Sequence, residues 1–220
     1  MRPPSPSIRT AFTLIELLAV MSIIVIMVAF VVPAVSNFGR STGLVAAGNM
    51  IVNLASSARQ TAMTKNTLTA LVLLANQGSD DDFRAVTVLE YNTVSGWVQS
   101  TQWQHFAPGV VVDSDPANSS FLLNSAKFPF LNYAGRPPQP DPPVSYDGKP
   151  LNGSASVRAR IFLPSGGLQN AESAAQIRLV EGFRANGTTV VTNRGSGGTS
   201  ANYYDVAIVP ATGMTKISRP

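Results

Sequence analysis

The most apolar part of the chain is an uninterrupted run near its N-terminus. Residues 12–32 form a stretch of 21 residues in which Glu16 alone can carry a charge. A helix of that length measures roughly 31 Å, close to the ~30 Å hydrocarbon core of a bilayer. The run therefore predicts one membrane-spanning helix, and no second run of 18 apolar residues follows it.

The helical period continues beyond Pro33 in an amphipathic form. Six apolar positions recur at spacings of three and four, namely Leu44, Ala47, Ile51, Leu54, Ala58 and Ala62. This spacing places them on one helix face, which we expect to cover a sheet. Gly39, Gly43 and Gly48 are compatible with a bendable helix and equally with close packing against a neighbouring element.

Beyond Asn66 the pattern changes to a period of two or to short apolar runs. Residues 67–75, 83–91 and 96–106 read as strands separated by turn-forming stretches, which predicts an antiparallel meander. Strand character returns in residues 156–164, 175–182 and 202–210. The predicted fold class is α+β, with a long N-terminal helix, transmembrane and then amphipathic, packed on an antiparallel sheet.

Residues 113–153 interrupt the strand pattern. They are rich in proline and include the sequence GRPPQPDPPVSYDGKP. Such composition favours extended, polyproline-like chain over packed structure. We therefore expect a surface-exposed insertion within the β-rich part of the chain.

Charge and composition narrow the function classes. The net charge of +4 is dispersed, so no basic cluster indicates a nucleic-acid surface. The absence of cysteine excludes disulfides, thiol chemistry and cysteine-ligated metals. Arg2 and Arg9 precede the apolar run, which by the positive-inside rule predicts a cytoplasmic N-terminus and places the large domain on the other side of the membrane.

Three interpretations of the N-terminus compete. A secretory signal peptide has a shorter apolar core, although the sequence Ala-Val-Ser at residues 34–36 is compatible with ordinary signal cleavage. A plain signal anchor gives Glu16 no purpose, although a carboxyl group inside a spanning helix costs a few kcal/mol. The third interpretation supplies a purpose for that carboxylate.

The sequence from Ala11 to Glu16, Ala-Phe-Thr-Leu-Ile-Glu, resembles the prepilin cleavage and methylation motif of type IV pilins and of type II secretion pseudopilins. The resemblance implies cleavage between Ala11 and Phe12, N-methylation of Phe12, an assembly role for Glu16 and a helix kink at Pro33. Ala11 replaces the glycine that is usual before the cut. The implied segments are a leader at residues 1–11, a transmembrane half at 12–35, an amphipathic half at 36–66 and an extracytoplasmic β-rich domain at 67–220.

The C-terminal region is similar to the end of H-type minor pseudopilins. The resemblance rests on a strand and turn with Phe162 and Gly166, followed by two strands and a final turn with Thr212 and Gly213. The insertion at residues 113–153 and the Ala11 variant resemble pseudopilins of the Verru_Chthon cassette protein D type.

The sequence indicates no catalytic or metal centre. A Ser-His-Asp arrangement around the single histidine, His105, would have to recruit Asp113 or Asp115, and no nucleophile motif supports it. Residues 80–82 and the pair Asp113 and Asp115 could offer oxygen ligands to calcium, but solvated turns explain these aspartates without a metal. We expect no cofactor and no enzymatic activity.

The pilin resemblance implies a structural role as a minor subunit of a type II secretion pseudopilus or a type IV pilus-like filament. Its expected partners are other pilin or pseudopilin subunits, prepilin peptidase, the inner-membrane assembly platform and membrane lipid, and we expect no nucleic acid. The implied location is the bacterial inner membrane, single-pass, with the C-terminal domain in the periplasm or in an extracytoplasmic filament. The alternative is a signal-anchored extracytoplasmic binding or adhesion protein.

Overall fold

The computed structural model describes residues 13–75, 78–123, 145–151, 157–169, 174–195 and 199–220, without the side chains of residues 30–41 and Pro150. Its one long helix, α1, runs from Leu14 to Thr64. The chain divides into two compact units, residues 1–39 and residues 40–220. Among the described residues, no helical stretch combines the length and the apolarity that a bilayer crossing requires.

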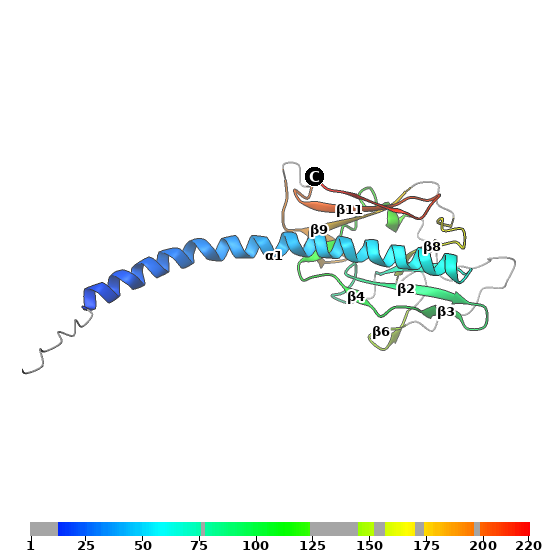
Figure 1. The fold of residues 1–220 in the computed structure, drawn as a ribbon, viewed down its shortest axis with the longest axis horizontal. Helices are drawn as coiled ribbons and strands as arrows, with labels where there is room; N and C mark the ends of the chain where they lie inside the picture. The colour runs from blue at the N-terminus through cyan, green and yellow to red at the C-terminus, as the bar shows by residue number, and fades with distance from the viewer. Residues whose placement is uncertain (1–12, 76–77, 124–144, 152–156, 170–173, 196–198) are drawn as a thin grey trace, which may run out of the picture. The chain divides into compact units, whose positions relative to one another are not determined.

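The described part of the second unit contains two five-stranded antiparallel sheets and a separate two-stranded sheet (Figure 1). Sheet A has the order β3-β2-β1-β8, with β4 also paired to β2; its strands are β1 Thr69–Leu74, β2 Ala85–Asn92, β3 Gly96–Gln99, β4 Gln104–His105 and β8 Val157–Phe162. Sheet B has the order β10-β9-β11-β12, with β5 also paired to β9; its strands are β5 Val110–Val112, β9 Ala175–Ala185, β10 Thr188–Val191, β11 Tyr203–Ile208 and β12 Thr215–Ser218. The α+β class predicted from the sequence is confirmed.

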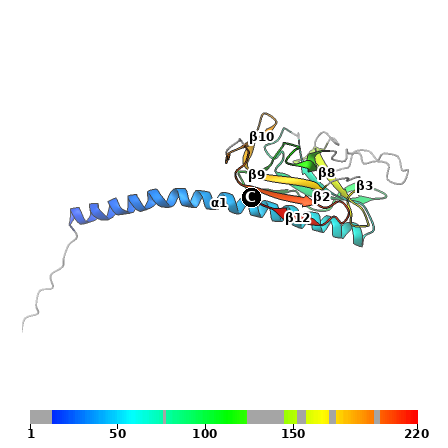
Figure 2. The ribbon, with the colours of Figure 1, turned by 90° about the horizontal axis from the view of Figure 1, so that it is seen from above.

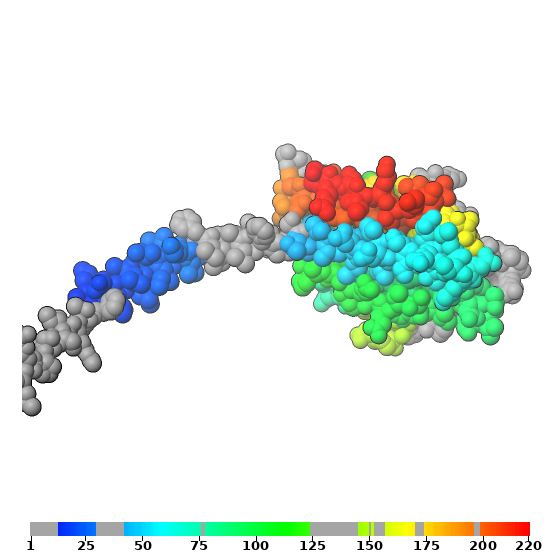
Figure 3. Space-filling model, viewed as in Figure 1, coloured from blue at the N-terminus to red at the C-terminus, as the bar shows by residue number. Residues whose placement is uncertain are grey.

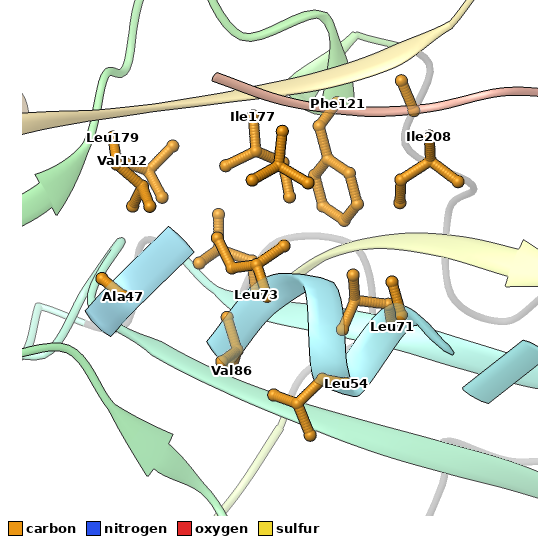
Figure 4. Packing of buried hydrophobic residues seen from close by; sticks show 14 of the residues in the cluster. Ala47, Leu54, Leu71, Leu73, Val86, Val112, Phe121, Ile177, Leu179 and Ile208 are labelled. Atoms are coloured by element: carbon orange, nitrogen blue, oxygen red, sulfur yellow. The ribbon is translucent and has the colours of Figure 1, made fainter. Parts of the chain in front are cut away.

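The C-terminal half of α1 packs against both sheets through its apolar face. All six positions of the predicted face, from Leu44 to Ala62, are buried. They join one core with inward-facing residues of both sheets, such as Leu71 and Leu73 of β1 and Ile177 and Leu179 of β9 (Figure 4). The amphipathic period therefore predicted the buried face correctly, and that face covers two sheets instead of one.

Hydrogen bonds tie α1 to each sheet. The Thr69 hydroxyl donates to the Ala58 carbonyl at 2.7 Å on the side of sheet A, and the Tyr204 hydroxyl donates to Asn49 Oδ1 at 3.1 Å on the side of sheet B. A methyl group on Gly48 would lie 2.2 Å from Tyr204 Cε1. Of the two interpretations of the helix glycines, close packing therefore holds at Gly48.

Sheet A is buried on both faces. All six residues of β1 are buried, and a second apolar cluster on the other face of the sheet includes Val72, Leu89 and Trp97. A strand covered on both faces needs apolar side chains at every position, which explains the continuous run in the sequence TALVLL. Leu151, from the end of the predicted insertion, belongs to this second cluster.

The described parts of residues 113–153 correct the expectation of an exposed insertion. A short 3₁₀ helix, η1 Ser120–Leu122, places Phe121 in the main core with no solvent exposure. The hairpin of β6 Ser145–Tyr146 and β7 Lys149–Pro150 precedes buried Leu151. The proline-rich composition did not predict these contacts because single apolar anchors carry no period. Residues 124–144, which hold most of the prolines, lie outside the described residues.

The predicted strand at residues 96–106 is divided into β3 and β4, which both pair with β2. Between them Thr101 satisfies polar groups of β2 in another way: its hydroxyl accepts from the Val88 backbone N–H at 2.9 Å, and its carbonyl accepts from the Thr87 hydroxyl at 2.7 Å. The short strands β5, β10 and β12 were not predicted, since three or four residues are too few to establish a period.

Candidate functional site

The N-terminal end of α1 is a capping box built from Thr13 and Glu16. The Glu16 backbone N–H donates to the Thr13 hydroxyl at 3.3 Å. In return, the Glu16 carboxylate accepts from the Thr13 hydroxyl at 3.3 Å and from the Thr13 backbone N–H at 3.4 Å. This reciprocal arrangement satisfies backbone donors that the first turn of a helix leaves unpaired. The motif Thr-Leu-Ile-Glu thus encodes a helix start, which the sequence analysis did not recognise.

The helix surface that follows is apolar on every side. Every large apolar side chain from Leu14 to Val28 is exposed, at between 48% and 82% of its full surface. An amphipathic helix would hide one face and present polar groups on the other, but here no face is polar apart from Glu16 and Ser22. The Ser22 hydroxyl donates back to the Leu18 carbonyl at 2.8 Å, which removes its need for water.

Three residues of the predicted processing region cannot be placed in full. Ala11 and Phe12, the predicted cleavage and methylation positions, lie outside the described residues. Pro33 lies within α1, which continues through this position as a single helix, and the side chain of Pro33 is outside the described part of the chain. Cleavage, methylation and the kink at Pro33 therefore stay predictions.

The structure brings the four C-terminal motif residues together. Gly166 in the turn after β8 has φ +88°, and Gly213 in the turn between β11 and β12 has φ +64°. A methyl group on Gly213 would lie 2.1 Å from the Gly166 carbonyl oxygen and 3.1 Å from Cδ1 of buried Phe162. The two turns therefore meet backbone to backbone, which joins sheet A to sheet B.

A residue that the sequence analysis did not select, Arg59 of α1, fixes this junction to the helix. Its Nε donates to the Thr212 carbonyl at 2.6 Å, and its side chain lies where a methyl group added to either motif glycine would meet it. The sequence marks this residue by its charge, because Arg59 is the only charged residue between Arg40 and Lys65. A lone arginine among small helix residues indicates a specific contact better than it indicates a solvated face.

A groove opens beside the junction, between α1 and the start of β12. Its volume is about 400 Å³, and its lining consists of Ser56, Arg59, Gln60, Met63, Thr64, Gly213, Met214 and Thr215. We call it the α1–β12 groove. Figure 2 shows β12 running beside the C-terminal half of α1, and Figure 3 shows the two surfaces meeting on an open face of this unit. Among the described residues of the lining, Arg59 alone carries a charge.

His105 belongs to a polar cluster that holds the β6–β7 hairpin. Its Nε2 lies 2.8 Å from the Tyr146 hydroxyl, which donates to the Asp81 carboxylate, and Trp103 Nε1 donates to the Ser145 carbonyl at 3.1 Å. Burial, reinforced by the Asp81 carboxylate, raises the pKa of the Tyr146 phenol. The protonated phenol donates to the turn that precedes β2 and so holds the hairpin against that turn.

Three of the aspartates considered as calcium ligands, Asp82, Asp113 and Asp115, accept hydrogen bonds from the backbone of their own turns. Asp113 Oδ1 accepts from the Asp115 backbone N–H at 3.0 Å, and Asp115 Oδ1 accepts from the Ala117 backbone N–H at 2.9 Å. In the same way Asp82 Oδ2 accepts from the Gly78 N–H at 3.0 Å. Over the described ranges, no three carboxylate or imidazole groups gather in a metal-binding arrangement.

Comparison with known proteins finds likeness in structure alone. No family model matches the chain, and no curated protein matches its sequence. Two solved structures of the minor pseudopilin EpsH from the type II secretion system of Vibrio cholerae are similar to it. One has 9% identity and a TM-score of 0.42 and covers 80% of this chain and 97% of that chain. The other has 10% identity and a TM-score of 0.40 and covers 80% and 94%.

Proposed function

We propose that this chain is a minor pseudopilin or pilin-like subunit, which a prepilin peptidase processes and which assembles into a type II secretion pseudopilus or a type IV pilus-like filament. The observation that carries the proposal is the contrast between the halves of α1. The half from Leu44 to Ala62 buries its apolar face in the chain's own domain, whereas the half from Leu14 to Val28 exposes apolar side chains on every side.

A helix with that surface needs apolar surroundings. Each Å² of apolar surface that stays in water costs about 25 cal/mol of free energy relative to its burial. Twelve large apolar side chains are exposed on this half of the helix, so leaving them in water is strongly unfavourable. A bilayer offers such surroundings to a single subunit, and the helices of neighbouring subunits offer them within a filament. In this proposal residues 12–35 pass from the inner membrane into the filament, and the β-rich domain stays outside the cytoplasm.

The role proposed for Glu16 has two stages. In the single subunit the Glu16 carboxylate accepts hydrogen bonds from the Thr13 hydroxyl and backbone N–H. These bonds lower the free-energy cost of placing the carboxylate near the membrane surface. In the filament the amine of Phe12, created by cleavage after Ala11, is a cation that can pair with Glu16 of a neighbour. Their attraction strengthens as the local dielectric constant falls. The carboxylate then favours subunits docked in one register.

The remaining polar clusters support a structural role over a catalytic one. The donors and acceptors of His105, Asp113 and Asp115 are engaged in holding the hairpin and the turns described above. The proposal therefore includes no enzymatic activity and no cofactor, and its partners are other filament subunits, the peptidase, the assembly platform and membrane lipid.

The processing step tests this proposal. We expect a mature N-terminus at Phe12 bearing an N-methyl group, measured by intact mass and by N-terminal peptide analysis of the membrane-bound chain. The substitution Ala11→Leu should accumulate the precursor, because the site requires a small residue before the cut. Ala34→Leu is the matched control, since it blocks the alternative cut near residues 34–36 and should leave processing unchanged. An uncut chain, or one cut near those residues, contradicts the proposal and favours a signal-anchored or secreted binding protein.

A further inference from the structure

We infer that the α1–β12 groove binds an extended segment of a neighbouring filament subunit other than a second copy of this chain, and that in this segment a carboxylate stands next to a large apolar side chain. The inference rests on the proposed function and names a docking surface and the chemistry of its partner.

The apolar part of the recognition comes from three exposed side chains. Met63 of α1 is 46% exposed and Met214 in the final turn is 60% exposed, and both line the groove. Ile217, which is 49% exposed, shares a face of β12 with Thr215, another lining residue, because side chains alternate along a strand. Methionine side chains adapt their shape to an apolar ligand and are frequent on binding surfaces. The other large exposed apolar residues described in this unit are Val94, Leu123 and Phe183. None of these three lines the groove.

The charged part comes from Arg59. Its Nε is held by the Thr212 carbonyl, so the guanidinium has a fixed position at the groove. Among the described residues, Lys65 and Arg178 lie within ion-pair distance of a carboxylate, whereas Arg59 forms no such pair. None of the described residues that line the groove is acidic. A pre-positioned cation without a counter-charge complements a carboxylate, which guanidinium groups bind in a planar geometry.

The position of the groove favours a subunit of the same assembly as the occupant. The groove lies on α1, the helix whose N-terminal half is the proposed assembly surface. Its other wall is β12, the last strand of sheet B, which pairs with β11 and has no further described strand beyond it. An edge strand beside an apolar groove is a surface to which a neighbouring chain can be added.

Two exposed serines of α1 provide a matched test. Ser56 lines the groove and Ser57 does not, and both are exposed, so a substitution at either position does not disturb the core.

In the full chain, Met214→p-benzoylphenylalanine places a photo-reactive group in the groove, and the same substitution at exposed Phe183 is the positional control. After irradiation of sheared filaments, we expect Met214 to crosslink to a different filament subunit, at a segment that mass spectrometry shows to contain an acidic residue beside a large apolar one.

The charge dependence then decides the inference. Ser56→Glu should lower the crosslink yield at least about tenfold, because like charges across an interface are strongly disfavoured. Ser57→Glu and Ser56→Lys should leave the yield within about twofold of the parent. A yield that is equally insensitive to both glutamates, crosslinks to lipid, or crosslinks to a second copy of this chain would overturn the inference. If the chain enters filaments normally but crosslinks no more at Met214 than at Phe183, the groove does not bind a neighbouring subunit, and the proposed function is unaffected. If the chain is absent from filaments, both the inference about the groove and the proposed function are wrong.

Discussion

At the scale of single residues, two glycines explain how the turn after β8 can meet the turn between β11 and β12. Gly166 and Gly213 both adopt positive φ, and the second lies where any side chain would meet the backbone of the first. The sequence resemblance selected these positions together with Phe162 and Thr212, but it could not show what they do. Their shared role became visible once Arg59 was seen to bind the Thr212 carbonyl from 153 residues away in the sequence.

The substitution Gly213→Ala tests the turn junction. We expect it to lower the free energy of unfolding by about 2–3 kcal/mol, since it adds a backbone clash to the cost of a positive φ. Gly187→Ala is the matched control, because Gly187 has φ +78° and open space around the missing methyl group. It should cost about 1 kcal/mol. Urea unfolding of the full chain in detergent, followed by tryptophan fluorescence, measures both. Equal losses would show that the contact with Gly166 has no energetic role.

At the scale of elements, α1 serves two environments with two patterns. Its C-terminal half carries the helical period that a half-buried helix requires, and every residue of the predicted face is buried. Its N-terminal half has no period, because all of its faces are apolar. The strands show the same principle: β1, which is covered on both faces, is apolar throughout, whereas β8 alternates buried and half-buried residues along much of its length. Both patterns could be read from the sequence.

Phe121 tests whether the predicted insertion is part of the core. Phe121→Ala should cost about 3–5 kcal/mol of unfolding free energy, as expected for an aromatic ring removed from a core, because its side chain is fully buried between the sheets. Leu123→Ala, two residues away and 49% exposed, should cost less than about 1 kcal/mol. The same urea unfolding experiment measures both. A small loss at Phe121 would restore the view that this segment is an exposed loop.

At the scale of the whole molecule, the sequence predicted the fold class and the buried helix face, and it missed the division of the strands into two sheets. The pairing of β9 with β5 joins residues 67 to 71 positions apart across the insertion, and the pairing of β9 with β11 joins residues 23 to 33 positions apart; local periodicity records neither. The capping box is encoded in the sequence Thr-Leu-Ile-Glu, but the apolar residues around Glu16 indicate a membrane helix more strongly than they indicate a helix start. The α1–β12 groove could not be predicted, since its walls come from elements about 150 residues apart.

The proposed function requires above all that Glu16 acts in assembly and is not needed for membrane insertion. The most direct measurement compares the amount of the chain in the membrane fraction with the amount in sheared filaments, for the parent and for Glu16→Leu. We expect Glu16→Leu to insert at least as well as the parent and to be cleaved after Ala11, but to be lost from filaments, because the capping carboxylate and its proposed pairing with the Phe12 amine are gone. Glu16→Gln should share the defect in part, since it keeps a hydrogen-bonding group without the charge. Normal incorporation of Glu16→Leu into filaments would contradict the account.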